Sequence, residues 1–289
     1  MNSISVKAYA KINLGLDVLR KREDGYHDVC MIMQSLDLHD NITINKSTTE
    51  GIKITTNLSY LPNDQGNLVY KAAALFLETI SVNEGLTITL DKVIPVAAGL
   101  AGGSSDAAAT LHGLNELYHA GLTLEELKKL GVKLGADVPY CLMLGTALSE
   151  GIGEILTPLS PMPECSILLV KPEINVSTKY VYENLRLSTS ITHPDITAMR
   201  ASLSKGDLMA LTKTMDNILQ TVTITNYPII TSIKDKMKEL GALTSLMSGS
   251  GPTVFGIYND YELGEKALHY FKKHRGYGKQ VYLTKPYWP

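Results

Sequence analysis

Apolar and polar residues alternate along the first twenty residues of the chain. Every second residue from Val6 to Val18 is apolar, and the positions between them include Lys11, Asn13 and Asp17. A period of two predicts a strand with one buried face. Lys11 and Asn13 are two residues apart and therefore share the opposite face, which is either a solvated edge or a binding surface.

Hydrophobic periodicity predicts further strands and helices in the first half of the chain. Strands are expected at 40–46, 51–56 and 86–90, and helices at 67–80 and from 106 to 118. Thr123 with Glu126 has the spacing of a capping box, which opens a helix that ends near residue 134. Residues 135–139 interrupt that helix, and 141–157 is expected to hold strand and turn.

Three prolines between Thr157 and Glu164 mark a candidate domain boundary. We therefore predict an N-terminal domain at 1–157 and a C-terminal domain at 158–289. The elements expected beyond the boundary are a strand at 166–170, a helix at 178–185, two or three helices between 195 and 240, strands at 242–247 and 252–258, a helix at 261–273 and a strand at 279–284. This β-α-β-β-α-β order with inserted helices matches a ferredoxin-like split βαβ unit, so the expected fold class is α+β.

Composition excludes several classes of protein. The 289 residues carry 27 basic and 29 acidic side chains. The chain therefore lacks the excess of basic residues that would indicate a nucleic-acid or membrane partner. The three cysteines form no C-x-x-C, and the histidines form no H-E-x-x-H. The N-terminus lacks the apolar core of a signal peptide, and no stretch is long and apolar enough to span a bilayer. We expect a cytoplasmic protein.

Residues 95–106 form a glycine-rich segment between a predicted strand and a predicted helix. Free backbone N–H groups at a helix N-terminus favour an anion, and glycines let phosphate approach the backbone closely. Ser104 and Ser105 would then donate to phosphate oxygens. The alternative is a flexible turn in which a serine caps the helix. The segment is neither a Walker A loop nor G-x-G-x-x-G.

Three other segments carry candidate chemistry. The turn at 24–27 ends in Tyr26 and His27, an aromatic beside an imidazole that either holds a planar base or decorates a loop. Asp137 is either a general base for a hydroxyl group or the N-cap of a helix. The sequence S-G-S-G-P at 248–252 is either a tight turn or a second loop that contacts an anion.

Taken together, these segments resemble the GHMP kinase family, which comprises galacto-, homoserine, mevalonate and phosphomevalonate kinases. The resemblance spans nearly the whole chain and rests on A-K-I-N-L at 10–14, P-x-x-x-G-L-x-G-G-S-S-D at 95–106 and S-G-S-G-P at 248–252. A branch of the family with a cytidylated substrate is similar in R-x-D-G-Y-H at 22–27, G-A-D-V-P at 135–139, E-G-x-G-E at 150–154 and K-P at 171–172. This chain departs from the pattern at Ala97, Ala98 and Ala101, where relatives often have glycine, and at Asp106, where some have Asn.

The resemblance implies a two-domain kinase with an ATP-binding N-terminal domain. It implies transfer of the γ-phosphoryl group of ATP, accompanied by Mg²⁺, to the 2-hydroxyl of a cytidylated methylerythritol on the non-mevalonate route to isoprenoid precursors. By motif position, Asp137 would be the catalytic base and Lys11 its cationic partner. Such a lysine would keep the aspartate ionised.

The resemblance also implies the binding residues. The ATP site would comprise Asn67, Pro95, Val96, Ala97, Ala98, Gly99, Leu100, Ala101, Gly102, Gly103, Ser104 and Ser105. The substrate site would comprise Asn13, Tyr26, His27, Thr178 and Tyr182, with Tyr180 as a competitor for the role of Tyr182. The resemblance does not identify the ligands of Mg²⁺, for which Ser105 is a candidate. A monomer or weak homodimer is expected.

Three alternatives stay open on the sequence alone. A mevalonate-, phosphomevalonate- or homoserine-type kinase would not need the D-G-Y-H segment. An RNA-binding protein of the same topology would bind RNA with a strong salt dependence, and the net charge of −2 disfavours it. An inactive nucleotide sensor would not need Lys11 and Asp137, which are both present.

Overall fold

The computed structural model describes residues 2–187 and 192–289. It contains two compact units, each assembled from separate stretches of chain. Unit 1 comprises Met1–Ala10, Leu38–Val96 and Ala101–Leu144, and unit 2 comprises Lys11–Asp37, Ala97–Leu100 and Gly145–Pro289. The boundary expected at 157/158 stays a prediction.

Two long strands contribute residues to both units. β1 (Ser3–Lys21) contains the alternating segment predicted as a strand, and its apolar residues from Ala8 to Val18 are buried. β2 (His27–Ser47) pairs with β1 and is much longer than the predicted strand at 40–46. The apolar positions of the alternating pattern in β1 thus face the core, as predicted.

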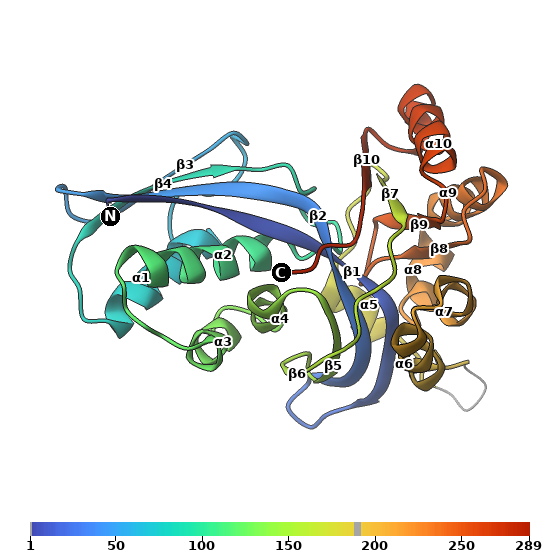
Figure 1. The fold of residues 1–289 in the computed structure, drawn as a ribbon, viewed down its shortest axis with the longest axis horizontal. Coiled ribbons are helices and arrows are strands. Elements are labelled where there is room, and N and C mark those ends of the chain that lie inside the picture. Colours follow the sequence, from blue (N-terminus) through green and yellow to red (C-terminus); the bar gives the residue numbers. More distant parts are fainter. Residues whose placement is uncertain (1, 188–191) are drawn as a thin grey trace. The chain divides into compact units, whose positions relative to one another are not determined.

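Unit 1 packs helices against a small sheet. The end of β2 pairs antiparallel with β4 (Gly85–Asp91), and β3 (Ile52–Thr56) pairs parallel with β4. The helices α1 (Leu68–Thr79) and α2 (Gly102–Leu117) lie side by side on one face of these strands (Figure 1). The helix α1 buries the i, i+3, i+4, i+7 stripe expected of an amphipathic helix: Val69, Ala72, Ala73, Phe76 and Leu77.

Two shorter helices complete unit 1. The capping box predicted at Thr123 and Glu126 is confirmed, and it opens α3 (Leu124–Val132). A further helix, α4 (Val138–Met143), begins directly after Asp137. The expectation of only strand and turn from residue 141 is therefore wrong at its start, because the turn at 135–137 leads into a helix with Pro139 in its first turn.

Unit 2 contains two sets of paired strands. The first half of β2 pairs antiparallel with β5 (Thr146–Gly151), which pairs with β6 (Ile155–Pro158). A separate four-stranded antiparallel sheet has the order β10-β7-β9-β8. Its strands are β7 (Ser166–Lys171), β8 (Thr244–Met247), β9 (Val254–Tyr258) and β10 (Gln280–Thr284).

Helices α9 (Ile229–Glu239) and α10 (Tyr261–Lys273) pack against this sheet, and a single 3₁₀ turn (Arg275–Tyr277) precedes its last strand. The strand order and the βαββαβ succession are those of the predicted ferredoxin-like unit, which is confirmed. In the described residues, no helix combines the length and the apolar character needed to cross a bilayer.

The helices inserted in unit 2 are shorter and more numerous than predicted. The helix α5 (Thr178–Asn184) lies where one was expected. Within 195–240, where every residue is described, four helices replace the expected two or three, namely α6 (Ile196–Lys205), α7 (Leu208–Thr214), α8 (Gln220–Asn226) and α9. Gly206, at a φ of +66°, ends α6, and the Asp207 side chain caps the start of α7. These helix-ending and helix-capping residues divide one apolar pattern into separate helices.

Candidate active site

The glycine-rich segment adopts a backbone that favours glycine at several positions. Gly99 has a φ of +74°, and the alanines Ala97 and Ala101 have φ values of +50° and +56°. An L-residue in this left-handed region costs roughly 1–2 kcal/mol relative to the right-handed one. Contacts elsewhere must therefore hold the segment in this conformation.

The start of helix α2 leaves backbone donors for an anion. The N-cap is Ala101, which makes no side-chain capping bond, so the alternative of a serine cap is wrong. Ser104 and Ser105 instead lie in the first turn, where the Ser105 hydroxyl donates to the carbonyl of Tyr9. The first N–H groups of a helix have no intrahelical acceptor, and they form an anion-binding site when no side chain caps them.

In unit 2, three hydrogen bonds hold residues 98–100 of this segment. The Ser248 hydroxyl donates to the Gly99 carbonyl at 2.8 Å. The Thr253 N–H donates to the Ala98 carbonyl at 3.3 Å, and the Lys11 N–H to the Leu100 carbonyl at 3.1 Å. A Cβ on Gly99 would lie 2.2 Å from the Ser248 carbonyl oxygen, so only glycine fits there.

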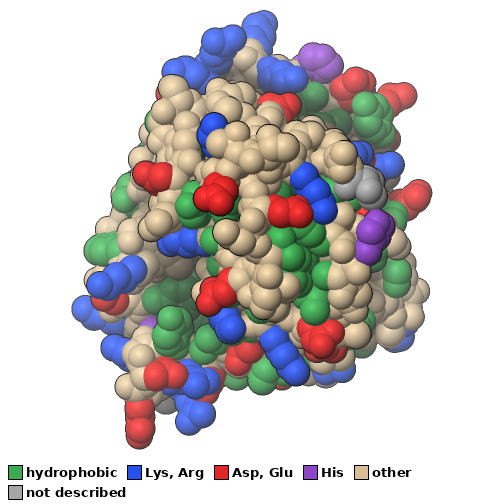
Figure 2. All heavy atoms as spheres, turned by 90° about the vertical axis from the view of Figure 1, so that its left-hand side faces the viewer, with side chains coloured by type: hydrophobic (Ala, Val, Ile, Leu, Met, Phe, Trp, Pro, Cys, Tyr) green, Lys and Arg blue, Asp and Glu red, His purple; other side chains and the backbone are tan. Residues whose placement is uncertain are grey.

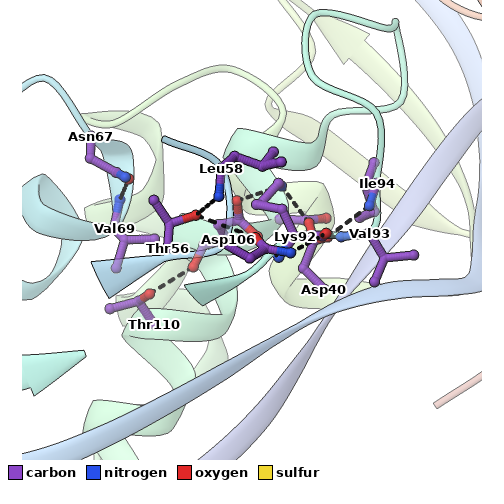
Figure 3. Close-up of polar contacts among 12 residues, drawn as sticks. Asp40, Thr56, Leu58, Asn67, Val69, Lys92, Val93, Ile94, Asp106 and Thr110 are labelled. Carbon is purple, nitrogen blue, oxygen red and sulfur yellow. Dashed lines mark hydrogen bonds and ion pairs between the residues drawn. The ribbon is translucent and has the colours of Figure 1, made fainter. Parts of the chain in front are cut away.

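In unit 1, a buried cluster of three charged side chains lies beside the start of α2 (Figure 3). The Lys92 ammonium donates to Asp40 and, at 2.7 Å, to Asp106 of α2. Asp40 also accepts from the N–H groups of Val93 and Ile94, at 2.5 and 2.8 Å. A Cβ on Gly102 would lie 3.2 Å from the Lys92 nitrogen, which places this charge against the first residue of the helix.

The cluster holds two carboxyl groups for one ammonium. Burial raises the pKa of Asp106 to about 8; the Lys92 charge opposes this rise and the Asp40 carboxylate adds to it. Burial acts to lower the pKa of Lys92, but the two carboxylates outweigh it and raise that pKa above its ordinary value. Asp106 Oδ1 is buried without a hydrogen-bond partner. Together with the raised pKa, this predicts that the cluster holds one proton at neutral pH, on Asp106.

Lys11 and Asn13, the predicted catalytic and substrate residues of β1, lie in unit 2 and are both buried. The Lys11 side chain donates to Asn13 Oδ1 at 2.8 Å, and Asn13 Nδ2 contacts the Met31 sulfur at 3.4 Å. The alternative of a solvated strand edge is therefore wrong. A buried ammonium requires hydrogen-bond partners of this kind.

Asp137, the predicted base, lies in unit 1 directly before α4. It occupies the N-cap position, yet its side chain makes no capping hydrogen bond to the helix. An aspartate at this position ordinarily accepts from the second or third N–H of the helix. Capping therefore does not account for this carboxylate.

Asn67, the predicted adenine neighbour, serves as the N-cap of α1. Its side-chain oxygen accepts from the Val69 N–H at 2.9 Å, and its amide nitrogen donates to the Pro62 carbonyl at 2.9 Å. Both ends of the side chain are thus used locally. Its role toward adenine stays a prediction.

The residues predicted to bind cytosine lie in unit 2 at the β1–β2 turn and on α5. The His27 and Tyr182 rings are 5.1 Å apart and tilted by 37°. Tyr26 is 59% exposed and Tyr180 is 45% exposed. Burial and the Lys21 charge lower the pKa of His27, so its imidazole is neutral at pH 7 and offers one donor and one acceptor.

Thr178, at the start of α5, contacts the S-G-S-G-P loop at 248–252. Its hydroxyl shares a 2.8 Å hydrogen bond with that of Ser250. The loop therefore contacts one predicted substrate residue and, through Ser248, one predicted ATP residue. Sequence analysis placed the loop among the candidates but gave it no partners.

Charged side chains show no segregation on the face of the molecule in Figure 2. Lysines and arginines alternate there with aspartates and glutamates. Among the described residues, no group of three His, Cys, Asp or Glu side chains is placed to hold a metal ion.

Asp40 and Lys92 were not predicted from the sequence. Asp40 lies within β2 and Lys92 directly after β4, and charged residues are usually solvated. Only the pairing of β2 with β4 brings Asp40 to the segment that follows Lys92. Asp106 carried a weak signal, as a charged residue four positions beyond Gly102 in the glycine-rich motif.

Comparison with known proteins agrees with this fold and with these motifs. Models of the N-terminal and the C-terminal domain of GHMP kinases match residues 67–145 and 198–276. The chain is 55% identical to the 4-diphosphocytidyl-2-C-methyl-D-erythritol kinase of Lachnoclostridium phytofermentans, over 99% of this chain and 98% of the relative. It is 49% identical to the enzyme of that name from Alkaliphilus oremlandii, over 99% and 98% of the two chains.

Solved structures extend the comparison. A crystal structure of 4-(cytidine 5'-diphospho)-2C-methyl-D-erythritol kinase matches with a TM-score of 0.85 and 31% identity, over 99% of this chain and all of that one. A homoserine kinase from Cytophaga hutchinsonii matches with a TM-score of 0.79 at 22% identity over 98% and 95% of the two chains, a likeness of fold alone. The chain belongs to the GHMP kinase family, and within it to the branch of 4-diphosphocytidyl-2-C-methyl-D-erythritol kinases.

The protonated state of Asp106 has a consequence for stability. Its pKa is higher in the folded chain than in the unfolded one, about 8 against about 3.9, so the folded state binds more protons between these values. The free energy of unfolding should then fall as pH rises through this window, by up to about 1.4 kcal/mol per pH unit. Asp106→Asn keeps an oxygen for Lys92 and should remove this slope.

Urea unfolding at pH 5, 6 and 7 measures the effect. The control is Asp235→Asn, which removes the same charge from an exposed position on α9. We expect the free energy of unfolding of Asp106→Asn, minus that of wild type, to increase with pH. The same difference for the control should not change with pH. Parallel pH profiles of Asp106→Asn and wild type would contradict a protonated Asp106.

Proposed function

We propose that this chain transfers the γ-phosphoryl group of ATP to the 2-hydroxyl of 4-diphosphocytidyl-2-C-methyl-D-erythritol, giving the 2-phosphate and ADP. The observation that carries this proposal is the 55% identity over nearly the full length to a relative of that name. The residues proposed to bind the substrate and the phosphates are compatible with this reaction. A cytoplasmic location and a monomer or weak homodimer remain predictions.

The start of α2 is the proposed phosphate site. Its first N–H groups, at Gly102, Gly103 and Ser104, offer donors and the positive end of the helix dipole to the ATP phosphates. The absence of a capping side chain at Ala101 supports this role, because a cap would occupy the same donors. The buried Lys92 ammonium lies beside Gly102 and, through its bond to Asp106 of α2, helps to hold the start of the helix in place.

Asp137 is the proposed general base. Its carboxylate would accept the proton of the 2-hydroxyl while the oxygen attacks the γ-phosphorus and the bond to the ADP oxygen breaks. Lys11 is proposed to supply positive charge as negative charge moves to the transferred group. Asn13, which accepts from Lys11 at 2.8 Å, would orient that ammonium.

Mg²⁺ is proposed to enter with ATP, whose phosphate charge it neutralises. Magnesium in phosphoryl transfer keeps several waters and uses one or two protein carboxylates besides phosphate oxygens. Ser105 is a poor ligand, since it is 2% exposed and its hydroxyl donates to the Tyr9 carbonyl.

His27 and Tyr182 are the proposed contacts to cytosine. A neutral imidazole offers the donor and the acceptor that a base edge needs, and Tyr182 offers a stacking face. Stacked rings lie about 4.5–7 Å apart, so no base fits between rings whose centroids are 5.1 Å apart. The base would therefore stack on the outer face of Tyr182 or separate the two rings, with Tyr26 as the second aromatic.

A panel of alcohols tests the proposed function. Wild-type protein with ATP and Mg²⁺ is given the cytidylated substrate, mevalonate or homoserine, and ADP release is followed. We expect kcat/KM to be at least about 10³-fold higher for the cytidylated alcohol, because the other two leave the base pocket empty. A preference for mevalonate or homoserine would replace the proposal by one of the sequence alternatives.

Asp137→Asn tests the base. The substitution keeps the shape of the side chain and removes its basicity, so kcat should fall by roughly 10²-fold or more while ATP binding changes little. A melting temperature close to that of wild type would show that the loss of kcat does not come from unfolding. The control is Asp207→Asn at a true cap, where the side chain accepts from the Ala210 N–H at 2.9 Å. A kcat near that of the control would rule out Asp137 as the base.

Tyr182→Ala and Tyr180→Ala test which tyrosine of α5 stacks on the base. Loss of one stacking face costs about 1–3 kcal/mol, so Tyr182→Ala should weaken the cytidylated substrate roughly 5- to 150-fold. Tyr180→Ala should change binding less than about 2-fold, because Tyr182 is the ring that contacts His27 whereas Tyr180 is 45% exposed. Competition by CDP against the substrate gives both values, and a larger effect of Tyr180→Ala would reverse the assignment.

A further inference from the structure

Asn217 is a buried polar residue that the proposed mechanism does not use. It lies in unit 2 between α7 and α8, and its side chain is 1% exposed. A buried amide is costly unless its donors and its acceptor are all paired. The partners of Asn217 therefore indicate what the residue does.

The Asn217 amide holds the start of the S-G-S-G-P loop. Its nitrogen donates to the carbonyls of Met247 and Gly249, each at 2.8 Å. Its oxygen accepts from the Leu219 N–H at 3.0 Å. The amide nitrogen thus donates to the last carbonyl of β8 and to a carbonyl within the loop, on either side of Ser248. A carboxylate or an apolar side chain of the same size has no donor and cannot make these two bonds.

The backbone around Asn217 is fixed to strand β1. The Leu16 N–H donates to the Asp216 carbonyl, and the Ile218 N–H to the Leu16 carbonyl, each at 3.0 Å. This short parallel bridge lies three residues beyond Asn13 on the strand that also carries Lys11. Asn217 thereby joins the loop to the strand of the proposed catalytic lysine.

The loop in turn contacts groups from both proposed substrate sites. Ser248 donates to the Gly99 carbonyl of the glycine-rich segment at 2.8 Å, and Ser250 pairs with Thr178 at 2.8 Å. A Cβ on Gly249 would lie 3.6 Å from Asn13 Oδ1. A shift of the loop would therefore move the donor segment and the acceptor residues against β1.

We propose that Asn217 is a positioning residue for phosphoryl transfer, which fixes the S-G-S-G-P loop to β1 and thereby aligns Gly99 and Thr178 with Lys11 and Asn13. The expected effect on kcat rests on the proposed function. The anchoring of the loop by Asn217 does not depend on that function. In the described part of the chain, the Asn217 side chain hydrogen-bonds to backbone atoms of Met247, Gly249 and Leu219, so it acts through the loop. Misplacement of reacting groups by about 1 Å can cost about 10²-fold in rate.

Asn217→Asp tests the anchor. The new carboxylate faces two carbonyl oxygens and donates to neither, so the loop should loosen. We expect kcat to fall about 10- to 100-fold, with KM for ATP and for the cytidylated substrate within about 3-fold of wild type. Hydrogen exchange of the amides at 248–251 should quicken at least about 10-fold.

The matched control is Asn115→Asp in unit 1. The Asn115 amide also joins a backbone carbonyl and N–H, those of Leu122, at 2.9 and 3.0 Å. The same chemical change there should leave both kcat and exchange at 248–251 within about 2-fold of wild type. Ser248→Ala removes the bond to Gly99 without introducing a charge, and it should lower kcat in the same way if Asn217→Asp does not fold.

The outcomes are distinguishable. Unchanged exchange at 248–251 in Asn217→Asp overturns the anchor, whatever the activity. Quickened exchange with unchanged kcat, or unchanged kcat in Ser248→Ala, overturns the positioning role. An inactive wild-type protein contradicts the proposed function, whereas the exchange measurement still decides on the anchor.

Discussion

A protein backbone can bind a triphosphate only where its N–H groups are uncovered, and residues 97–105, the proposed phosphate site, have a conformation that meets this constraint. The segment contains three residues at positive φ, two of them alanines, and a helix start without a side-chain cap. Each feature costs stability locally. The neighbouring residues of each unit must offset that cost, and the contacts around the segment show how they do so.

In unit 2 the segment is held by backbone and hydroxyl groups. Gly99 fits against the Ser248 carbonyl because it has no Cβ. Hydrogen bonds from Thr253, Ser248 and Lys11 fix the carbonyls of residues 98, 99 and 100 in turn. In unit 1 the start of α2 rests beside the buried Lys92, whose ammonium donates to Asp40 and to Asp106 of α2. Because the Lys92 charge is balanced by the Asp40 carboxylate, the cluster positions the start of α2, and the helix N–H groups and dipole are left for the proposed binding of phosphate.

Much of this site was predictable from the sequence because its parts are local in the chain. The alternation along β1, the capping box at Thr123 and the βαββαβ succession follow from periodicity and short-range chemistry. The glycine-rich segment is recognisable because the contact of phosphate with backbone demands small residues in consecutive positions. The His27–Tyr182 pair was accessible only through the family resemblance, since 155 residues separate the two rings.

The contacts that hold the site were not predictable, because each depends on pairing between distant segments. Asp40 meets Lys92 only through the register of β2 with β4, and Asn217 meets the loop at 247–249 only after the inserted helices have packed. A single Asn between two short helices carries no sequence signal of such a role. The number of helices between 195 and 240 was also predicted wrongly. A single apolar pattern continues through several short helices, and capping residues between them end one helix and begin the next.

A crystal structure with a non-hydrolysable ATP analogue, Mg²⁺ and the cytidylated alcohol would test the account most directly. The account predicts phosphate oxygens within about 3.2 Å of the N–H groups at 102–104. It also predicts the Asp137 carboxylate within about 2.6–3.2 Å of the 2-hydroxyl. A triphosphate bound away from the start of α2, or a hydroxyl that faces a base other than Asp137, would contradict it.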